Sequence, residues 1–304
     1  MSCELCVNDY SVMFLEPGIR NTHDMKLRFA LIVSAVFSAM ILSATYSAAD
    51  VAPIVSPSPS ASMVMNFTVR CPFSHTANLD PIVMPGMSGM GHQHEFFGNT
   101  STNENSTTQS LLAAPTTCAK IGQFTDANNH SAYWVPSLYQ NGKRIIPTAV
   151  YASYTQLSGS NGSVSPFPNG FKAVTGRSSQ TVVWGCTSID TQSLFTKAIE
   201  DVPTCQSPQH LFARVSFANC WNGLSTDSLD HASHLELQYR VAGKTQCPST
   251  HQIKVPMLTL NVQYPVATIT NDGVSLASGL PSTMHADMFE AWTNDGLTKR
   301  MTRN

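Results

Sequence analysis

Short segments of apolar or alternating residues, separated by Gly, Pro and Asn, occupy the chain from Met63 onward. Alternation with a period of two puts successive side chains on opposite faces, so these segments predict β-strands. The dipeptide Asn141-Gly142 between two of them is a strong hairpin signal. The predicted strands are Ala132–Gln140, Lys143–Tyr154, Thr181–Cys186, Leu211–Phe217, Leu235–Val241 and Ile253–Tyr264.

Helical periodicity is restricted to two short segments, Ser193–Ile199 and His285–Trp292. Many short strands with few helices are typical of a mainly β fold, either an antiparallel β-sandwich or a jelly roll. Residues 50–62 are rich in Pro and Ser and predict a linker. Residues 63–304 contain no internal repeat, so the pattern predicts a single β-rich domain with long loops.

The start of the chain has the pattern of a targeting segment. Lys26 and Arg28 precede the apolar run Phe29–Leu42, and small residues follow it. This order predicts a secretory signal peptide within residues 1–49, and the run is too short and Ser/Ala-rich for a good membrane span. Met25 opens the signal, so we expect translation to begin there. The alternative is a genuine N-terminal extension that turns the segment into a membrane anchor.

Composition and cysteine count restrict the function classes. Only 12% of residues are charged and the formal net charge is -2, which argues against a nucleic-acid-binding protein and against disorder. Six of the eight cysteines follow the signal, and an even number in an exported chain predicts up to three disulfides. Their pairing stays open at this point. They are Cys71, Cys118, Cys186, Cys205, Cys220 and Cys247.

We therefore expect a secreted, extracellular protein without a stable membrane anchor after signal cleavage. In a eukaryotic secretory pathway it would be a glycoprotein, because Asn-x-Ser/Thr sequons accept glycans on surface loops. The sequons begin at Asn66, Asn99, Asn105, Asn129 and Asn161.

The ten histidines are the unusual feature, because most of them occur in groups. His92 and His94 are two residues apart, so on a strand they share one face, and the same holds for His285 and Asp287. Converging imidazoles can bind a divalent transition metal or act as an acid and a base. The candidate catalytic residues are His92, His94, Asp230, His231, His234, His285 and Asp287. The candidate metal ligands are His92, His94, His234 and His251.

Each of these groups also has a structural interpretation. Asp230 could cap the backbone N–H groups of a turn, and His285 with Asp287 could begin a helix. Aromatic side chains could stack on sugar rings as substrate-binding residues, or they could simply fill the core. The candidates for sugar stacking are Tyr133, Trp134, Trp221 and Trp292.

Several motifs follow one another in a specific order. They are Asp80-Pro-Ile-Val83, His92-x-His94, Ser131–Pro136, Trp184-Gly-Cys186, Cys220-Trp221, Leu229-Asp-His231-x-Ser-His234, Cys247-Pro-x-x-His251 and His285-x-Asp287-x-x-x-x-Trp292. With these motifs the chain resembles the secreted "domain of unknown function nineteen ninety-six" family of fungi and bacteria, from about Phe67 to Trp292. The resemblance marks the same histidines and aspartates, with His251 added. It departs from the family pattern at Ala218, Asn222, Glu290 and Ala291.

Two classes of function remain. The first is an extracellular enzyme, a hydrolase or a lyase, that acts on polysaccharide or cell-wall glycan through a metal-activated water or through His/Asp acid–base chemistry. Related domains are sometimes joined to carbohydrate-binding modules, so the resemblance implies a glycan partner and favours the enzyme. The second is a non-catalytic carbohydrate- or cell-wall-binding protein in which the histidines form a structural or metal-binding cluster.

Overall fold

A computed structural model gives the arrangement of the chain after residue 65. The residues it describes are 66–119, 124–156, 163–176, 181–187, 195–197, 202–242, 244–265 and 273–302. The predicted signal peptide, the predicted linker and the sequon at Asn161 lie outside the described residues. Within the described ranges, no helix is long and apolar enough to cross a membrane.

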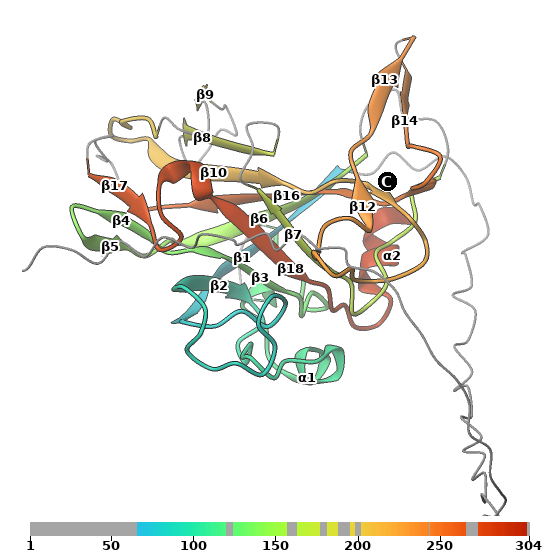
Figure 1. Cartoon of the computed structure of the whole chain (residues 1–304), viewed down its shortest axis with the longest axis horizontal. Helices are drawn as coiled ribbons and strands as arrows, with labels where there is room; N and C mark the ends of the chain where they lie inside the picture. The colour runs from blue at the N-terminus through green and yellow to red at the C-terminus, as the bar shows by residue number, and fades with distance from the viewer. Residues whose placement is uncertain are drawn as a thin grey trace, which may run out of the picture. The chain divides into compact units, whose positions relative to one another are not determined.

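Strands dominate the described chain (Figure 1). They are β1 (Asn66–Ala77), β2 (His94–Gly98), β3 (Ala132–Pro136), β4 (Leu138–Gln140), β5 (Lys143–Ile145), β6 (Ala149–Thr155), β7 (Lys172–Gly176), β8 (Val182–Thr187), β9 (Phe195–Lys197), β10 (His210–Ser216), β11 (Cys220–Trp221), β12 (Leu235–Glu236), β13 (Tyr239–Val241), β14 (Lys244–Gln246), β15 (Ile253–Lys254), β16 (Met257–Gln263), β17 (Val274–Leu276) and β18 (His285–Phe289). The helices are α1 (Thr108–Ala113) and α2 (Gly296–Thr302), with short 3₁₀ turns at Thr117–Ala119 and Pro281–Thr283.

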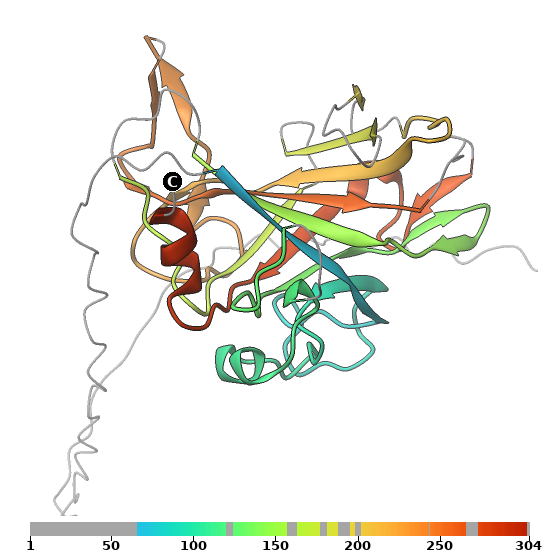
Figure 2. The same cartoon turned by 180° about the vertical axis from the view of Figure 1, so that it is seen from behind.

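Ten strands form one antiparallel sheet in the order β7-β18-β3-β2-β1-β6-β16-β10-β8-β9. Strand β1 joins its two halves, because residues 66–72 pair with β6 and residues 73–77 pair with β2. Figure 2 shows β1, in blue, running obliquely from one half to the other. The expected mainly β, antiparallel fold is confirmed.

The main core lies between the two halves of this sheet. Tyr133 and Met288 come from the half that contains β2, while Val150 and Leu260 come from the other half, and all four are fully buried in one hydrophobic cluster. The sheet is nearly closed into a barrel, because the Thr175 hydroxyl of β7 donates to the backbone carbonyl of β10 at residue 216, at 3.1 Å. Burial between two layers is the arrangement that alternating strands favour.

A second, smaller cluster covers the outer face of β2, β3 and β18. The fully buried side chains of Phe96 and Trp134 meet Phe289 there, and residues from the segments before β2 and before β3 pack over them. Its remaining buried members are Leu79, Ile82, Leu111, Ala132 and Ala291. This outer face, rather than the main core, carries the histidines discussed below.

The structure confirms the predicted hairpin and corrects the predicted helices. Asn141 and Gly142 both have positive φ, 50° and 73°, and they form the tight turn between β4 and β5. His285–Trp292 begins with strand β18, not with a helix, because pairing with β3 and β7 overrides the helix propensity of its Ala, Met and Glu. Within Ser193–Ile199 the described part is strand β9.

The six cysteines form three disulfides, as expected, and the structure gives their pairing: Cys71–Cys118, Cys186–Cys205 and Cys220–Cys247. Three disulfides are typical of a chain that folds in an oxidising compartment.

Two of the sequons do not lie on the surface, contrary to expectation. Asn99 and Asn129 are fully buried, and the Asn99 amide donates to the backbone carbonyls of Leu111 and His130 at 2.9 and 3.0 Å. Asn66 and Asn105 are exposed. Of the four described sequons, only the two exposed ones fit the predicted role of glycan acceptor.

Candidate metal centre

Sheet register brings three histidines together on the outer face. Directly paired residues of an antiparallel ladder share a face of the sheet. His94 pairs with Pro136 of β3, and Asp287 pairs with Trp134 of the same strand. Because Trp134 and Pro136 are two residues apart, His94 and Asp287 lie on the same face. His285, two residues before Asp287 on β18, shares that side. These residues come from segments almost 200 positions apart in the chain.

The three imidazoles are close enough to hold one ion. The ring centroids of His92 and His94 are 4.1 Å apart, and that of His285 is 5.1 Å from His92 and 5.7 Å from His94. One ring nitrogen of each residue lies within 4.8 Å of the others. No ion is present in the structure. Three imidazole nitrogens at one point are a common ligand set for zinc or copper.

Backbone carbonyls fix the tautomers of two of these rings. A carbonyl oxygen only accepts, so His94 Nδ1–H donates to Leu79 O at 2.9 Å and His285 Nδ1–H donates to Thr283 O at 2.9 Å. Nε2 of each neutral ring therefore carries a lone pair. His94 Nε2 is buried, and in the described part of the chain it has no hydrogen-bond partner. Metal-bound histidines usually donate their other N–H to a carbonyl or carboxylate in this way.

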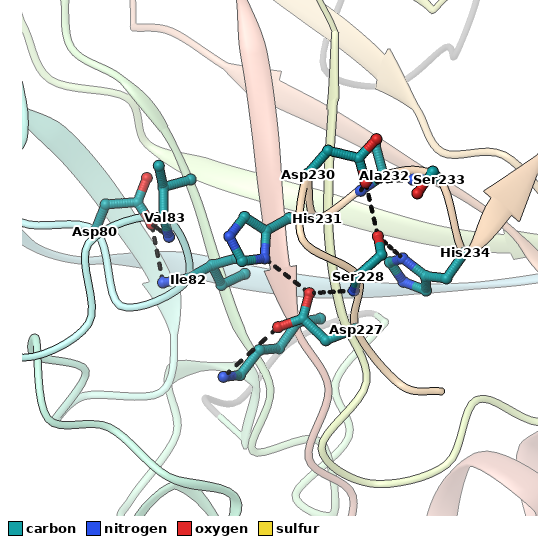
Figure 3. Close-up of polar contacts among 11 residues, drawn as sticks. Asp80, Ile82, Val83, Asp227, Ser228, Asp230, His231, Ala232, Ser233 and His234 are labelled. Atoms are coloured by element: carbon teal, nitrogen blue, oxygen red, sulfur yellow. Dashed lines mark hydrogen bonds and ion pairs between the residues drawn. The ribbon is translucent and has the colours of Figure 1, made fainter. Parts of the chain in front are cut away.

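Two buried carboxylates adjoin the imidazoles. Asp80 and Asp287 each place an oxygen within 4.8 Å of a His94 nitrogen and of one another, and Asp287 Oδ2 is 4.0 Å from His285 Nε2. Asp80 Oδ1 accepts the backbone N–H groups of Ile82 and Val83 at 3.0 and 2.9 Å, which holds its carboxylate in place (Figure 3). A divalent cation here would balance the charge of carboxylates that are removed from water.

The environment keeps His94 neutral. Burial lowers the pKa of His94 well below its usual 6.5, and the neighbouring imidazoles His92 and His285 lower it further, whereas its hydrogen bond with Leu79 has the opposite effect. A neutral imidazole is the form that binds a metal, so burial favours the metal-binding form of His94.

A His/Asp pair lies in the loop that is attached to β7. His231 Nδ1 and Asp227 Oδ1 are 2.7 Å apart, and Lys172 Nζ is 4.0 Å from the other oxygen of Asp227 (Figure 3). The backbone N–H of Val174 on β7 donates to the carbonyl of His231 at 2.8 Å, and Val174 pairs with Asp287 on the other side. A carboxylate that holds Nδ1 directs the Nε2 of a histidine toward proton transfer.

Asp230 lies nearby but has the contacts of a turn cap. Its Oδ1 accepts the backbone N–H groups of Ala232 and Ser233 at 3.2 and 2.9 Å and the Ser228 hydroxyl at 2.8 Å. The backbone N–H of Ser233 is the largest of the effects that hold the pKa of the exposed Asp230 carboxyl well below its usual range. These contacts match the structural interpretation that the sequence allowed for Asp230.

The structure assembles a different ligand group from the four predicted histidines. Among the described residues, His234 and His251 are not members of the group around His94. His234 Nδ1 is 2.9 Å from the Ser228 hydroxyl, and burial lowers the pKa of His234. His251 Nε2 donates to the carbonyl of Ser233 at 3.0 Å. The residues that lie around His94 instead are His92, His285 and the two aspartates.

The predicted sugar-stacking residues belong to the interior. Tyr133 and Trp134 are fully buried, and Trp221 and Trp292 are only 4% exposed. A ring with no accessible face cannot stack on a sugar, so the core interpretation replaces the substrate-binding one for all four.

Sequence reasoning missed two kinds of polar residue. Asp80 was noted only as part of a motif and Asp227 was not named, although each is a carboxylate near a histidine. Glu290 was noted only as a departure from a pattern, yet it is fully buried and accepts Trp292 Nε1–H at 2.7 Å and the Tyr154 hydroxyl at 3.2 Å. Burial raises the pKa of Glu290 from 4.5 to about 7. An acid inside the apolar run 288–292 was the available signal.

Comparison with known proteins identifies the family without supplying an activity. No curated protein and no solved structure matches this chain. The family profile described as "Domain of unknown function (DUF1996)" matches residues 80–292, which include all three clustered histidines, both buried aspartates and the Asp227–His231 pair. The match covers most of the chain, and the protein therefore belongs to the DUF1996 family.

Proposed function

We propose that this protein is an exported, metal-dependent hydrolase that acts on an extracellular polysaccharide. His92, His94 and His285 bind a divalent transition metal ion, and Asp80 and Asp287 lie beside it. Export is supported by the three disulfides and by the predicted signal peptide. The glycan substrate is supported by the resemblance to domains that are joined to carbohydrate-binding modules.

The observation that carries the proposal is the buried lone pair of His94 Nε2. Leaving a buried polar group without a partner costs about 1–3 kcal/mol. One ring nitrogen of His94 lies within 4.8 Å of a ring nitrogen of His92 and of one of His285, and a cation among the three would give the buried Nε2 a partner.

The proposed chemistry needs three imidazole ligands and an open fourth position on the metal. A metal ion bound by three imidazoles lowers the pKa of a bound water toward 7. Asp287, whose Oδ2 is 4.0 Å from His285 Nε2, would be the general base at this site. The Asp227–His231 pair, which is attached to the strand next to β18, supplies a group that can protonate a leaving alcohol.

A non-catalytic metal site is the second candidate, and burial of the cluster favours it. His94 and Asp287 are fully buried and His285 is nearly so. If Asp287 completes a four-coordinate site, the ion has no open position, as in structural zinc sites. The histidines would then stabilise the fold of a glycan-binding domain.

The first test is the metal content of the protein expressed from about Ala49, without a His tag, through an oxidising compartment. We expect about one equivalent of transition metal by mass spectrometry, and its loss in His94→Ala and His285→Ala. His251→Ala is the matched control, because this residue lies outside the group and should leave the metal in place. A wild-type protein that stays metal-free after incubation with excess zinc or copper would refute the metal site.

The second test separates the two candidates. In the cobalt-substituted protein, azide should change the visible spectrum if the ion has an open position, and should leave it unchanged if the site is closed. Polysaccharides would then be screened for reducing-end release with and without chelator. Chelator-sensitive release that His231→Asn diminishes while metal content stays constant supports the hydrolase. A closed site with no release supports the binding protein.

A further inference from the structure

Three methionines lie in the segment that leads into the three-histidine site. Met84, Met87 and Met90 follow one another at intervals of three residues, and His92 comes two residues after the last of them. Met87 is 54% exposed, Met90 is 65% exposed and Met84 is half-buried. We refer to residues 84–90 as the methionine loop.

Such exposure is local to this loop. The described methionines Met284, Met288 and Met301 are all buried in the main core, where long apolar side chains are normally found. In the methionine loop the side chains of Met87 and Met90 are exposed instead. The backbone there is ordered by hydrogen bonds: Met87 N–H donates to the carbonyl of Met84 at 3.2 Å, and the N–H at position 86 donates to the carbonyl of Glu104 at 2.8 Å. One turn therefore keeps the backbones of Met84 and Met87 near each other.

The loop ends at the histidine site. Two residues of chain span at most about 7 Å, so the backbone of Met90 lies within that distance of His92. His92 itself is partly exposed, while His94 and His285 lie beneath it in the buried part of the group. The C-terminal end of the methionine loop is thus close to the exposed member of the three-imidazole group.

The ligand types identify the ion. Thioether sulfur is a soft ligand that selects Cu(I), whereas imidazole binds copper, zinc, iron and nickel alike. We propose that the methionine loop binds Cu(I) and transfers it to His92, His94 and His285, so that copper is the metal of this protein. The transfer itself exchanges ligands without a change of oxidation state, and one-electron oxidation by dioxygen, with superoxide as the reduced product, then gives the divalent ion of the proposed function. The inference rests on the proposed metal site and adds the identity of the ion and its route of entry.

The test compares the wild-type protein with the triple variant Met84→Leu/Met87→Leu/Met90→Leu. Leu keeps an apolar side chain of similar volume and removes only the sulfur, so the fold should be unaffected. Cu(I) affinity is measured with ascorbate present, by competition with bicinchoninate, and the measurement is repeated with Ag(I) as a redox-inert substitute. Met257→Leu, on β16, is the matched control, because this partly exposed methionine lies outside the loop.

We expect the triple variant to bind Cu(I) and Ag(I) at least tenfold more weakly and to load the histidine site more slowly. Its zinc affinity should equal that of the wild type, and Met257→Leu should change neither value. Equal Cu(I) affinity and loading rate in wild type and triple variant would overturn the inference. That outcome would leave the loop as an apolar contact surface.

Failure of the metal site itself gives a different result. In His94→Ala the methionine loop is intact, so we expect Ag(I) binding to the thioethers to persist while zinc binding is lost. If the wild type binds zinc and copper but ignores Ag(I), the histidine site stands and the methionine loop is excluded as a copper ligand. If the wild type binds Ag(I) but neither copper nor zinc at the histidines, the proposed function and the transfer step are both refuted.

Discussion

Glu290→Gln should make the fold less sensitive to alkaline pH. The Glu290 carboxyl is fully buried, accepts hydrogen bonds from Trp292 and Tyr154, and belongs to the network that also contains Tyr133. Gln has nearly the same shape, keeps the oxygen that accepts the Trp292 N–H, and can donate to the Tyr154 hydroxyl. The substitution therefore removes the ionisation while it preserves the packing and most of the hydrogen bonds.

The magnitude follows from proton linkage. Burial, the largest cause, raises the pKa of Glu290 from 4.5 to about 7 in the folded state. Between these two values the folded state holds the proton more tightly than the unfolded state, so the free energy of unfolding falls as pH rises. The difference is roughly 2.5 pH units at about 1.4 kcal/mol each, or about 3 kcal/mol lost by pH 8.

Urea unfolding of wild type and Glu290→Gln at pH 5, 6, 7 and 8 checks this. The other titrating groups are common to both proteins, so the difference between the two free energies isolates Glu290. We expect the variant to gain up to about 3 kcal/mol relative to wild type between pH 5 and pH 8. A difference that stays constant over this range would refute the reasoning, because Glu290 would then ionise in the folded state as it does in water.

Three further predictions follow from the described structure. Gly176→Ala should destabilise the fold by about 1–3 kcal/mol and weaken zinc binding, because its φ is 131° and a Cβ would collide with the backbone of His285; urea unfolding and zinc titration test both effects. Zinc at 100 times its Kd should add about 2.7 kcal/mol and raise Tm by roughly 5–10 °C, as a thermal scan with and without chelator would show. In a eukaryotic host, peptide mapping should find glycans at Asn66 or Asn105 and none at the two buried sequons.

Local sequence patterns were sufficient for the fold class and for part of the site. Period-two alternation predicted strands, and it correctly put the side chains of His285 and Asp287 on one face. The same segment also fitted a short helix, because a short apolar run is compatible both with the 3.6-residue period of a helix and with the two-residue period of a strand. The segment forms a strand because it pairs with β3, which is far away in the sequence.

The membership of the ligand group depends on this non-local pairing. Nothing in a single sequence shows that β18 lies between β3 and β7, so His285 could not be preferred over His234 or His251 as a ligand. The position of Asp80 at the site was equally unpredictable, because its Asp-Pro context is typical of a turn. One oxygen of Asp80 does serve the turn, while the carboxylate also lies at the site. The aromatic residues were misassigned because residue type alone does not give accessibility.

The position of β18 in the sheet also determines when the site can form during synthesis. This strand is the last one described in the chain, yet it occupies the interior of the sheet between β3 and β7. A nascent chain that has emerged only as far as β17 has His92 and His94 but neither His285 nor Asp287. Chains cut short before β18 would therefore lack part of the candidate metal site, and under the proposed function metal retention would distinguish full-length folded molecules from truncated ones.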